Sequence, residues 1–230
     1  KKILVTSLVA ALYSSVAVAE NPIKMDDQSQ LSNIQAVDET TQYHQAPLEK
    51  DLPDNAYGAM VRKGHAIFVD TKNQVPEYVG NGMNCVNCHM DQGRLANAAP
   101  LWGAYPMYPA YRSKNNKVNT YAERIQGCFQ FSMDGTPPAA DSEAMTALIT
   151  YSYWLATNAP TGVSLPGRAY PKVAQPEGGY SIERGAKVYA DNCAFCHGSD
   201  GMGQKVADNY VFPPLWGKDS FNWGAGMHRI

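Results

Sequence analysis

The sequence carries few charged residues and little imbalance between the two signs. Only 17% of its 230 residues are charged, with 19 Lys and Arg against 21 Asp and Glu, which gives a net charge of −2. Loss of Lys1 and Lys2 with a leader segment would leave 17 basic residues against 21 acidic ones, a net charge of −4. Proteins that bind nucleic acid present a basic surface to the phosphates. The composition therefore argues against nucleic acid as a partner.

Long apolar runs are missing after residue 19. Before it, in KKILVTSLVAALYSSVAVAE, two lysines precede a mostly apolar stretch that ends in Ala-Val-Ala. This order is typical of a secretory signal peptide over 1–19, and it predicts an exported, periplasmic protein. An uncleaved anchor helix is the alternative. Residues 20–50 are polar and only weakly periodic, so we expect an N-terminal arm there.

Later parts of the chain show helical periodicity. Apolar residues recur at the spacing of amphipathic helices in three segments, 54–71, 141–157 and 181–192. Their expected N-terminal caps are, in order, Asp54, Asp141 and Ser181. Residues 158–179 are rich in Pro and Gly and have no helical period, so they are predicted to form a linker.

Two parts of the chain repeat one another. RKGHAIFVD at 62–70 aligns with ERGAKVYAD at 183–191. Each is followed by a CxxCH motif and then by PLWG, at 100–103 and again at 214–217. A repeat of this kind indicates an internal duplication.

The CxxCH motifs carry the chemistry of the repeat. Two thiols at this spacing bond the vinyl groups of one c-type haem, and the imidazole that follows binds the iron. A redox CxxC pair and half a zinc site are the alternatives, but two copies with an adjoining His in an exported chain disfavour both. The predicted haem-binding residues are Cys85, Cys88 and His89 for the first haem, and Cys193, Cys196 and His197 for the second.

The order helix, CxxCH, loop, helix is that of a small class I cytochrome domain. The predicted fold is mainly α, with two tandem cytochrome c domains over 51–157 and 180–230. We expect the second domain to be incomplete at its C-terminal end, because no closing helix follows its motif. Its distal iron ligand stays open: Met227 is a candidate, although it lies only 30 residues after His197.

The fifth cysteine, Cys128, belongs to neither motif. It lies 39 residues after His89, and Met133 lies 44 residues after the same histidine, so either can reach the distal face of the first haem. With Met133 as ligand, Cys128 is a buried and inert thiol. With Cys128 as ligand, coordination protects a thiol that is otherwise open to oxidation, and a thiolate lowers the reduction potential. Spacing alone leaves both ligands open.

The loop before Cys128 is basic in a chain that is acidic overall. Between residues 111 and 128, four basic residues oppose a single acidic one, Glu123, which gives a local charge of +3. The four are Arg112, Lys114, Lys117 and Arg124. Such a loop is either a solvated face or an anion-binding site, in which Arg supplies forked donors to oxyanions.

These stretches together resemble the thiosulfate dehydrogenase family of dihaem c-type cytochromes. The resemblance rests on CVNCH, the Gly-Arg at 93–94, APLWGAYPMYPAYRSKNNKVNT, ERIQGCFQFSM and FPPLWGKDSFNWGAGM. It implies that two thiosulfates are joined to tetrathionate, or the reverse, at a first haem with His89 and Cys128 as axial ligands. It also implies that the second haem passes electrons on to an external protein such as another c-type cytochrome.

Two thiosulfate dianions repel one another, so the reaction needs fixed positive charges nearby. The predicted catalytic residues are therefore Cys128, Arg112, Lys114 and Arg124, with Arg94 and Lys117 as weaker candidates. Two other functions remain open at this point: a dihaem electron carrier that binds no substrate, and a sulfur-carrier cytochrome subunit of a thiosulfate-oxidising complex.

Overall fold

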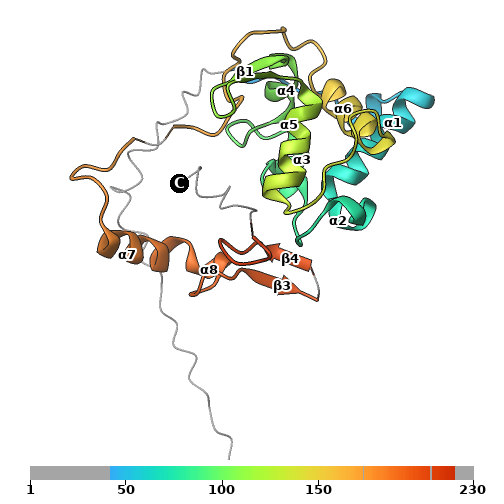
Figure 1. Ribbon diagram of the computed structural model, residues 1–230. Coiled ribbons are helices and arrows are strands. Elements are labelled where there is room, and N and C mark those ends of the chain that lie inside the picture. Colours follow the sequence, from blue (N-terminus) through green and yellow to red (C-terminus); the bar gives the residue numbers. More distant parts are fainter. Residues whose placement is uncertain (1–41, 173, 208, 221–230) are drawn as a thin grey trace, which may run out of the picture. The chain divides into compact units, whose positions relative to one another are not determined.

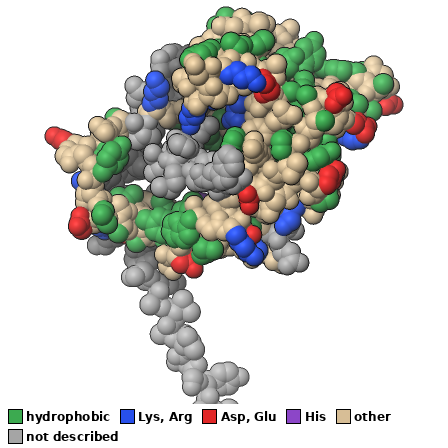
Figure 2. All heavy atoms as spheres, in the orientation of Figure 1, with side chains coloured by type: hydrophobic (Ala, Val, Ile, Leu, Met, Phe, Trp, Pro, Cys, Tyr) green, Lys and Arg blue, Asp and Glu red, His purple; other side chains and the backbone are tan. Residues whose placement is uncertain are grey.

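The computed structural model describes residues 42–172, 174–207 and 209–220. The predicted signal peptide, most of the predicted arm and the candidate ligand Met227 lie outside the described residues. Helices dominate the part of the chain that is described, as predicted, and none of these helices is long and apolar enough to cross a membrane. Acidic and basic side chains are interspersed over the face shown in Figure 2.

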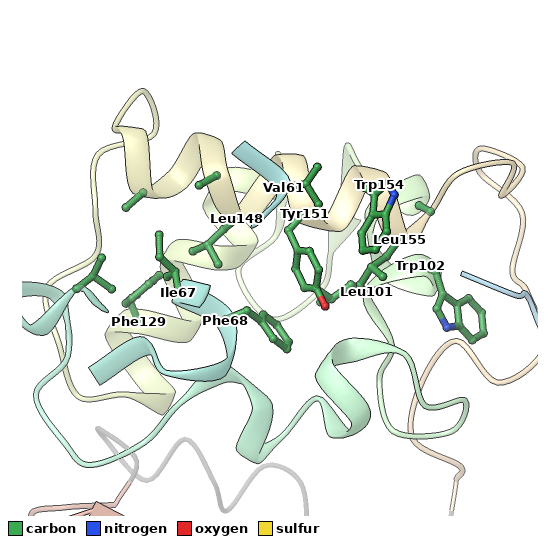
Figure 3. Close-up of a cluster of buried hydrophobic side chains, with 14 of the residues drawn as sticks. Val61, Ile67, Phe68, Leu101, Trp102, Phe129, Leu148, Tyr151, Trp154 and Leu155 are labelled. Carbon is green, nitrogen blue, oxygen red and sulfur yellow. The ribbon is translucent and has the colours of Figure 1, made fainter. Parts of the chain in front are cut away.

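The core of the first domain forms between its first and last long helices. These are α1 (Ala56–Val69) and α6 (Glu143–Leu155), which lie side by side in Figure 1. A Cβ on Gly64 would lie 2.1 Å from the carbonyl oxygen of Ala147, so this glycine lets the two backbones touch. Tyr151 of α6 packs on Phe68 of α1 with the ring centroids 5.6 Å apart (Figure 3).

The remaining elements of the first domain are short. Between the two long helices the chain forms α2 (Thr71–Gln74), η3 (Pro76–Tyr78), η4 (Cys85–Asn87), α3 (Met90–Gly93), α4 (Leu101–Ala104) and η5 (Tyr105–Met107). The hairpin of β1 (Ala110–Arg112) and β2 (Lys117–Asn119), α5 (Tyr121–Gly127) and the π-helical turn η6 (Cys128–Ser132) follow. Within the described residues before α1, the chain forms the 3₁₀ turn η2 (Glu49–Asp51). The hairpins were not predicted.

Two of the three predicted helix caps are wrong by one residue. The side chain of Asn55, not Asp54, accepts the Gly58 N–H at 3.0 Å, and Ser142 rather than Asp141 caps α6. In each pair both residue types are good caps, and the one that precedes the first helical turn takes the role. Ser181 caps α7 as expected.

The second repeat consists of α7 (Ile182–Asn192), α8 (Ala194–His197) and a hairpin of β3 (Gln204–Val206) with β4 (Asn209–Phe212). The apolar face that was predicted for α7 is not buried against the described residues, and Ile182 is 89% exposed. The described part of 158–179 forms no helix or strand. It is nevertheless not a free linker, because Leu165 packs against the core of the first domain.

Candidate functional site

The first CxxCH motif opens onto a cavity of about 440 Å³. Cys85, Cys88 and His89 line it, and so do Cys128 and Met133 from the turn η6. Apolar side chains from α1, α4 and η6 complete much of the wall, among them Phe68, Leu101 and Phe129. Pockets of roughly 300–1,000 Å³ with mostly apolar walls and a few polar groups are typical of cofactor sites.

The ring of His89 is held by a backbone carbonyl. Its Nδ1–H donates to the oxygen of Ala99 at 2.6 Å, so Nε2 is the nitrogen that can bind a metal. The second motif repeats this arrangement, since Nδ1 of His197 donates to the oxygen of Pro213 at 2.9 Å. Ala99 and Pro213 each directly precede PLWG. The duplicated PLWG therefore marks the segment that orients each haem-motif histidine.

Ala99 adopts an unusual backbone conformation for this purpose. Its φ is +50°, in the left-handed region that non-glycine residues rarely occupy. Such conformations persist where the surrounding structure requires them, and they cluster at functional sites. Here the conformation belongs to the residue whose carbonyl oxygen accepts the His89 proton.

A π-helical turn brings both candidate distal ligands to the cavity. The N–H of Met133 donates to the oxygen of Cys128 at 3.0 Å, a bond to the fifth residue back in place of the α-helical fourth. An α-helix would turn residues five apart away from one another, whereas this wider turn places them close to the same face. Cys128 and Met133 therefore both line the cavity, which spacing alone could not establish.

Arg124 lies one helical turn before Cys128 and contacts its sulfur. Its guanidinium donates to Cys128 Sγ at 3.0 Å. Burial acts to raise the pKa of this thiol, but the charge of Arg124, followed by the imidazole of His89, outweighs burial and lowers the pKa to about 6. His89 and Cys128 are thus neighbours in the cavity, and an imidazole and a thiolate so placed would be able to hold one iron.

The structure separates the predicted basic residues into two groups. Arg112 and Arg124 line the cavity. Lys114 is exposed on the turn of the β1–β2 hairpin, and Lys117 forms an ion pair with Glu123. Arg94 stacks over the ring of Trp154, 5.0 Å from its centroid, and does not line this cavity.

Arg168 is a third arginine in the cavity wall, and sequence reasoning missed it. It belongs to the segment that was predicted to be a linker. An arginine in a linker matches no motif, so the sequence did not indicate that Arg168 lines a binding site. None of the residues that line the cavity in the described part of the chain is Asp or Glu.

The residues present fit a c-type haem. Two thiols at CxxC spacing, an imidazole with a free Nε2, a sulfur opposite it and apolar walls are the donor set and surroundings of such a group. Cys193, Cys196 and His197 supply the same motif in the second repeat, with His197 oriented as His89 is.

Comparison with protein families finds two cytochrome c matches along the chain. Residues 77–160 match the cytochrome c domain of SoxA/TsdA, and residues 182–225 match the cytochrome c family. The prediction of a mainly α fold with two cytochrome c domains is therefore confirmed, and so is that of two covalently bound c-type haems.

The relatives of this chain include thiosulfate dehydrogenases from several bacteria. That of Stutzerimonas stutzeri is 66% identical over 227 residues, which cover 99% of this chain and 74% of that protein. That of Thiomonas intermedia is 46% identical over 220 residues, 96% of this chain and 69% of the relative. The as-isolated structure of the thiosulfate dehydrogenase TsdBA from Marichromatium purpuratum superimposes with a TM-score of 0.77 at 46% identity, covering 81% of this chain and 41% of that one. The chain belongs to the thiosulfate dehydrogenase family of dihaem c-type cytochromes.

Proposed function

We propose that this protein joins two thiosulfates to tetrathionate, or catalyses the reverse, in the cavity of the first domain. The observation that carries the proposal is the contact of Arg124 with Cys128 Sγ at 3.0 Å in a cavity that no described acidic residue lines. A sulfur atom beside a fixed positive charge is where a sulfur-containing dianion can be bound and react.

The reaction balances without protons. A bond forms between the outer sulfurs of two thiosulfate dianions, and the product is one tetrathionate dianion with release of two electrons. The bound haems supply one-electron acceptors for this pair. Cys193, Cys196 and His197 would hold the second haem, which would supply a route for the electrons to an external protein such as another c-type cytochrome.

The residues of the chain bind and orient the anions. Arg124 reaches the sulfur of Cys128, and Arg112, which donates to the hydroxyl of Tyr108 at 3.5 Å, offers a second guanidinium in the same cavity. Their charges oppose the repulsion between two dianions, and each presents a fork of donors that suits an oxyanion. Lys114 is exposed, so its charge acts only through solvent and is screened by salt.

The first residues of the chain support a proposal for the location of the reaction. We propose that the protein is exported to the periplasm through a signal peptide at 1–19. Export is consistent with a cytochrome that carries covalently attached haem. Mass spectrometry of the protein recovered from the periplasmic fraction should give a mature chain that starts near Glu20.

A turnover assay tests the activity and separates it from the alternatives. Purified holoprotein with thiosulfate and ferricyanide should produce tetrathionate without any other protein. A pure electron carrier would show no turnover, and a sulfur carrier would need a partner protein. The same preparation with tetrathionate and a reduced dye measures the reverse direction.

A further inference from the structure

Residues 165–170, here called the strap, cross the surface of the first domain beside its cavity. Three of them, Arg168, Ala169 and Tyr170, line the cavity wall. Leu165 packs against the hydrophobic core. The strap is thus part of the site, although it lies beyond α6 and reads in the sequence as a linker.

The contacts of the strap are with the segment that holds His89. The oxygen of Gly167 accepts the N–H of Asn97 at 2.7 Å, and the hydroxyl of Tyr170 donates to the oxygen of Cys88. The backbone of Arg168 crosses α4 at Gly103, where a Cβ would lie only 2.6 Å from Cα of Arg168. The final glycine of the first PLWG therefore admits the strap.

Arg168 and Arg124 are therefore held in the cavity wall by different segments of the chain. Arg168 is supported by residues between Cys88 and Gly103, the segment whose carbonyl orients His89. Arg124 belongs to α5 and contacts Cys128, a lining residue from the turn η6. Arg124 thus contacts the sulfur of Cys128, whereas Arg168 is held by the segment that orients His89.

Arg168 has no acidic partner among the described residues. Its Nε donates to the hydroxyl of Ser164 at 2.8 Å, and the ion pairs of the described chain do not include it. The residue is half-buried, and no described Asp or Glu lines its cavity. The guanidinium therefore brings to the cavity a positive charge that no described side chain neutralises, and its remaining N–H donors can bind an anion there.

We propose that Arg168 binds a carboxylate of the first haem, and that the strap positions it there. A c-type haem brings two propionate carboxylates, which are the anions the cavity walls themselves lack. A guanidinium matches a carboxylate through paired N–H donors. An ionised carboxylate near the haem would favour the oxidised iron, and the positive charge of Arg168 would offset that effect and raise the reduction potential. Arg168 is a positioning residue for the cofactor, and it does not contact the substrate.

The test compares three variants of the full dihaem protein: Arg168→Gln, Arg168→Lys and Arg62→Gln. Arg62 is an exposed arginine of α1 that pairs with Asp54 at 3.6 Å, so it controls for the loss of one positive charge. Spectroelectrochemical titration measures the midpoint potentials of both haems, and steady-state assays measure KM for thiosulfate. Neither readout alone can distinguish cofactor binding from substrate binding, but together they can.

Arg168→Gln should lower one of the two midpoint potentials and leave the other, with KM changed by less than about twofold. Arg168→Lys should restore most of the shift, and Arg62→Gln should show none. A KM that rises tenfold with both potentials unchanged would mean that Arg168 faces the substrate, and it would overturn the proposal. If Arg168→Gln carries no haem, Arg168→Lys decides: normal haem content supports the proposal, and loss of haem there too would show that packing of the side chain matters and its charge does not.

Discussion

At the scale of single residues, the chemistry of the site depends on a pair one helical turn apart. Arg124 and Cys128 face the same cavity because they are four residues apart across the junction of α5 and η6. The arginine lowers the pKa of the thiol against the opposing effect of burial. The sulfur is thereby kept in its anionic form, which is the form that binds iron.

Arg124→Gln should lower kcat/KM for thiosulfate by about tenfold or more, since loss of a hydrogen bond to a charged group costs about 1.5–3 kcal/mol. The measurement is steady-state turnover at low salt. Arg62→Gln removes an exposed arginine outside the cavity and is the control. Equal rates for both variants and the wild type would remove Arg124 from the substrate site.

The sequence could indicate Cys128 as a residue left over from two complete motifs, but it could not choose between Cys128 and Met133. That choice depends on whether the helix after Gly127 continues with α or π geometry, and no local pattern specifies a π turn. Arg168 was missed for a related reason. Its role depends on a close approach between the strap and Gly103, which are 65 residues apart in sequence.

At the scale of elements, helix ends were predicted to within two residues, and one of the three predicted caps, Ser181, was correct. The segment 54–71 contains α1 (Ala56–Val69), and 181–192 contains α7 (Ile182–Asn192). Adjacent residues such as Asp54 and Asn55 are both good caps, so only the backbone geometry decides between them. The two hairpins have strands of only three or four residues, which are too short to be detected from the spacing of apolar residues.

Asn55→Ala should lower the free energy of unfolding of the holoprotein by about 1 kcal/mol, because it removes the acceptor for the Gly58 N–H. Asp54→Ala should cost less, since the exposed pair of Asp54 with Arg62 contributes little. Chemical denaturation at neutral pH measures both. A larger loss for Asp54→Ala would contradict the assignment of the cap.

The start of α5 should show a pH dependence of its own. The hydrogen bond from Lys117, followed by the Thr120 N–H, lowers the pKa of Glu123 from 4.5 to about 2. A lowered folded pKa gives stability that is present above pH 4.5 and is lost as the pH falls toward 2. The wild type should therefore exceed Glu123→Gln in stability at pH 7, and the difference should shrink across this acid range. A difference that stays constant from pH 7 to 2 would exclude the carboxylate as its source.

At the scale of the whole molecule, duplication supplies two haem motifs with the same histidine support. In each repeat the residue before PLWG accepts the Nδ1 proton, from His89 in one and from His197 in the other. The repeats differ around this shared element. The first has a closing helix, a cavity with arginines and the strap, whereas α7 of the second has no buried residue among those described.

This asymmetry predicts distinct consequences for the loss of each haem. The double variant Cys193→Ala, Cys196→Ala should contain one haem per chain in a pyridine haemochrome assay, because covalent attachment needs the thiols. Its turnover with thiosulfate should fall, since one acceptor cannot store both electrons. Full turnover in a chain with one haem would show that the second haem is not needed for the reaction.

The central claim is that Cys128 is the sulfur opposite His89, and electron paramagnetic resonance of the oxidised holoprotein tests it most directly. The wild type should show a low-spin ferric signal of the thiolate type, which Cys128→Gly should abolish together with turnover and Met133→Leu should leave in place. A wild type without a thiolate-type signal, or a low-spin signal that is unchanged in Cys128→Gly and altered in Met133→Leu, would contradict the claim, and Met133 would then be the ligand and Cys128 a buried thiol.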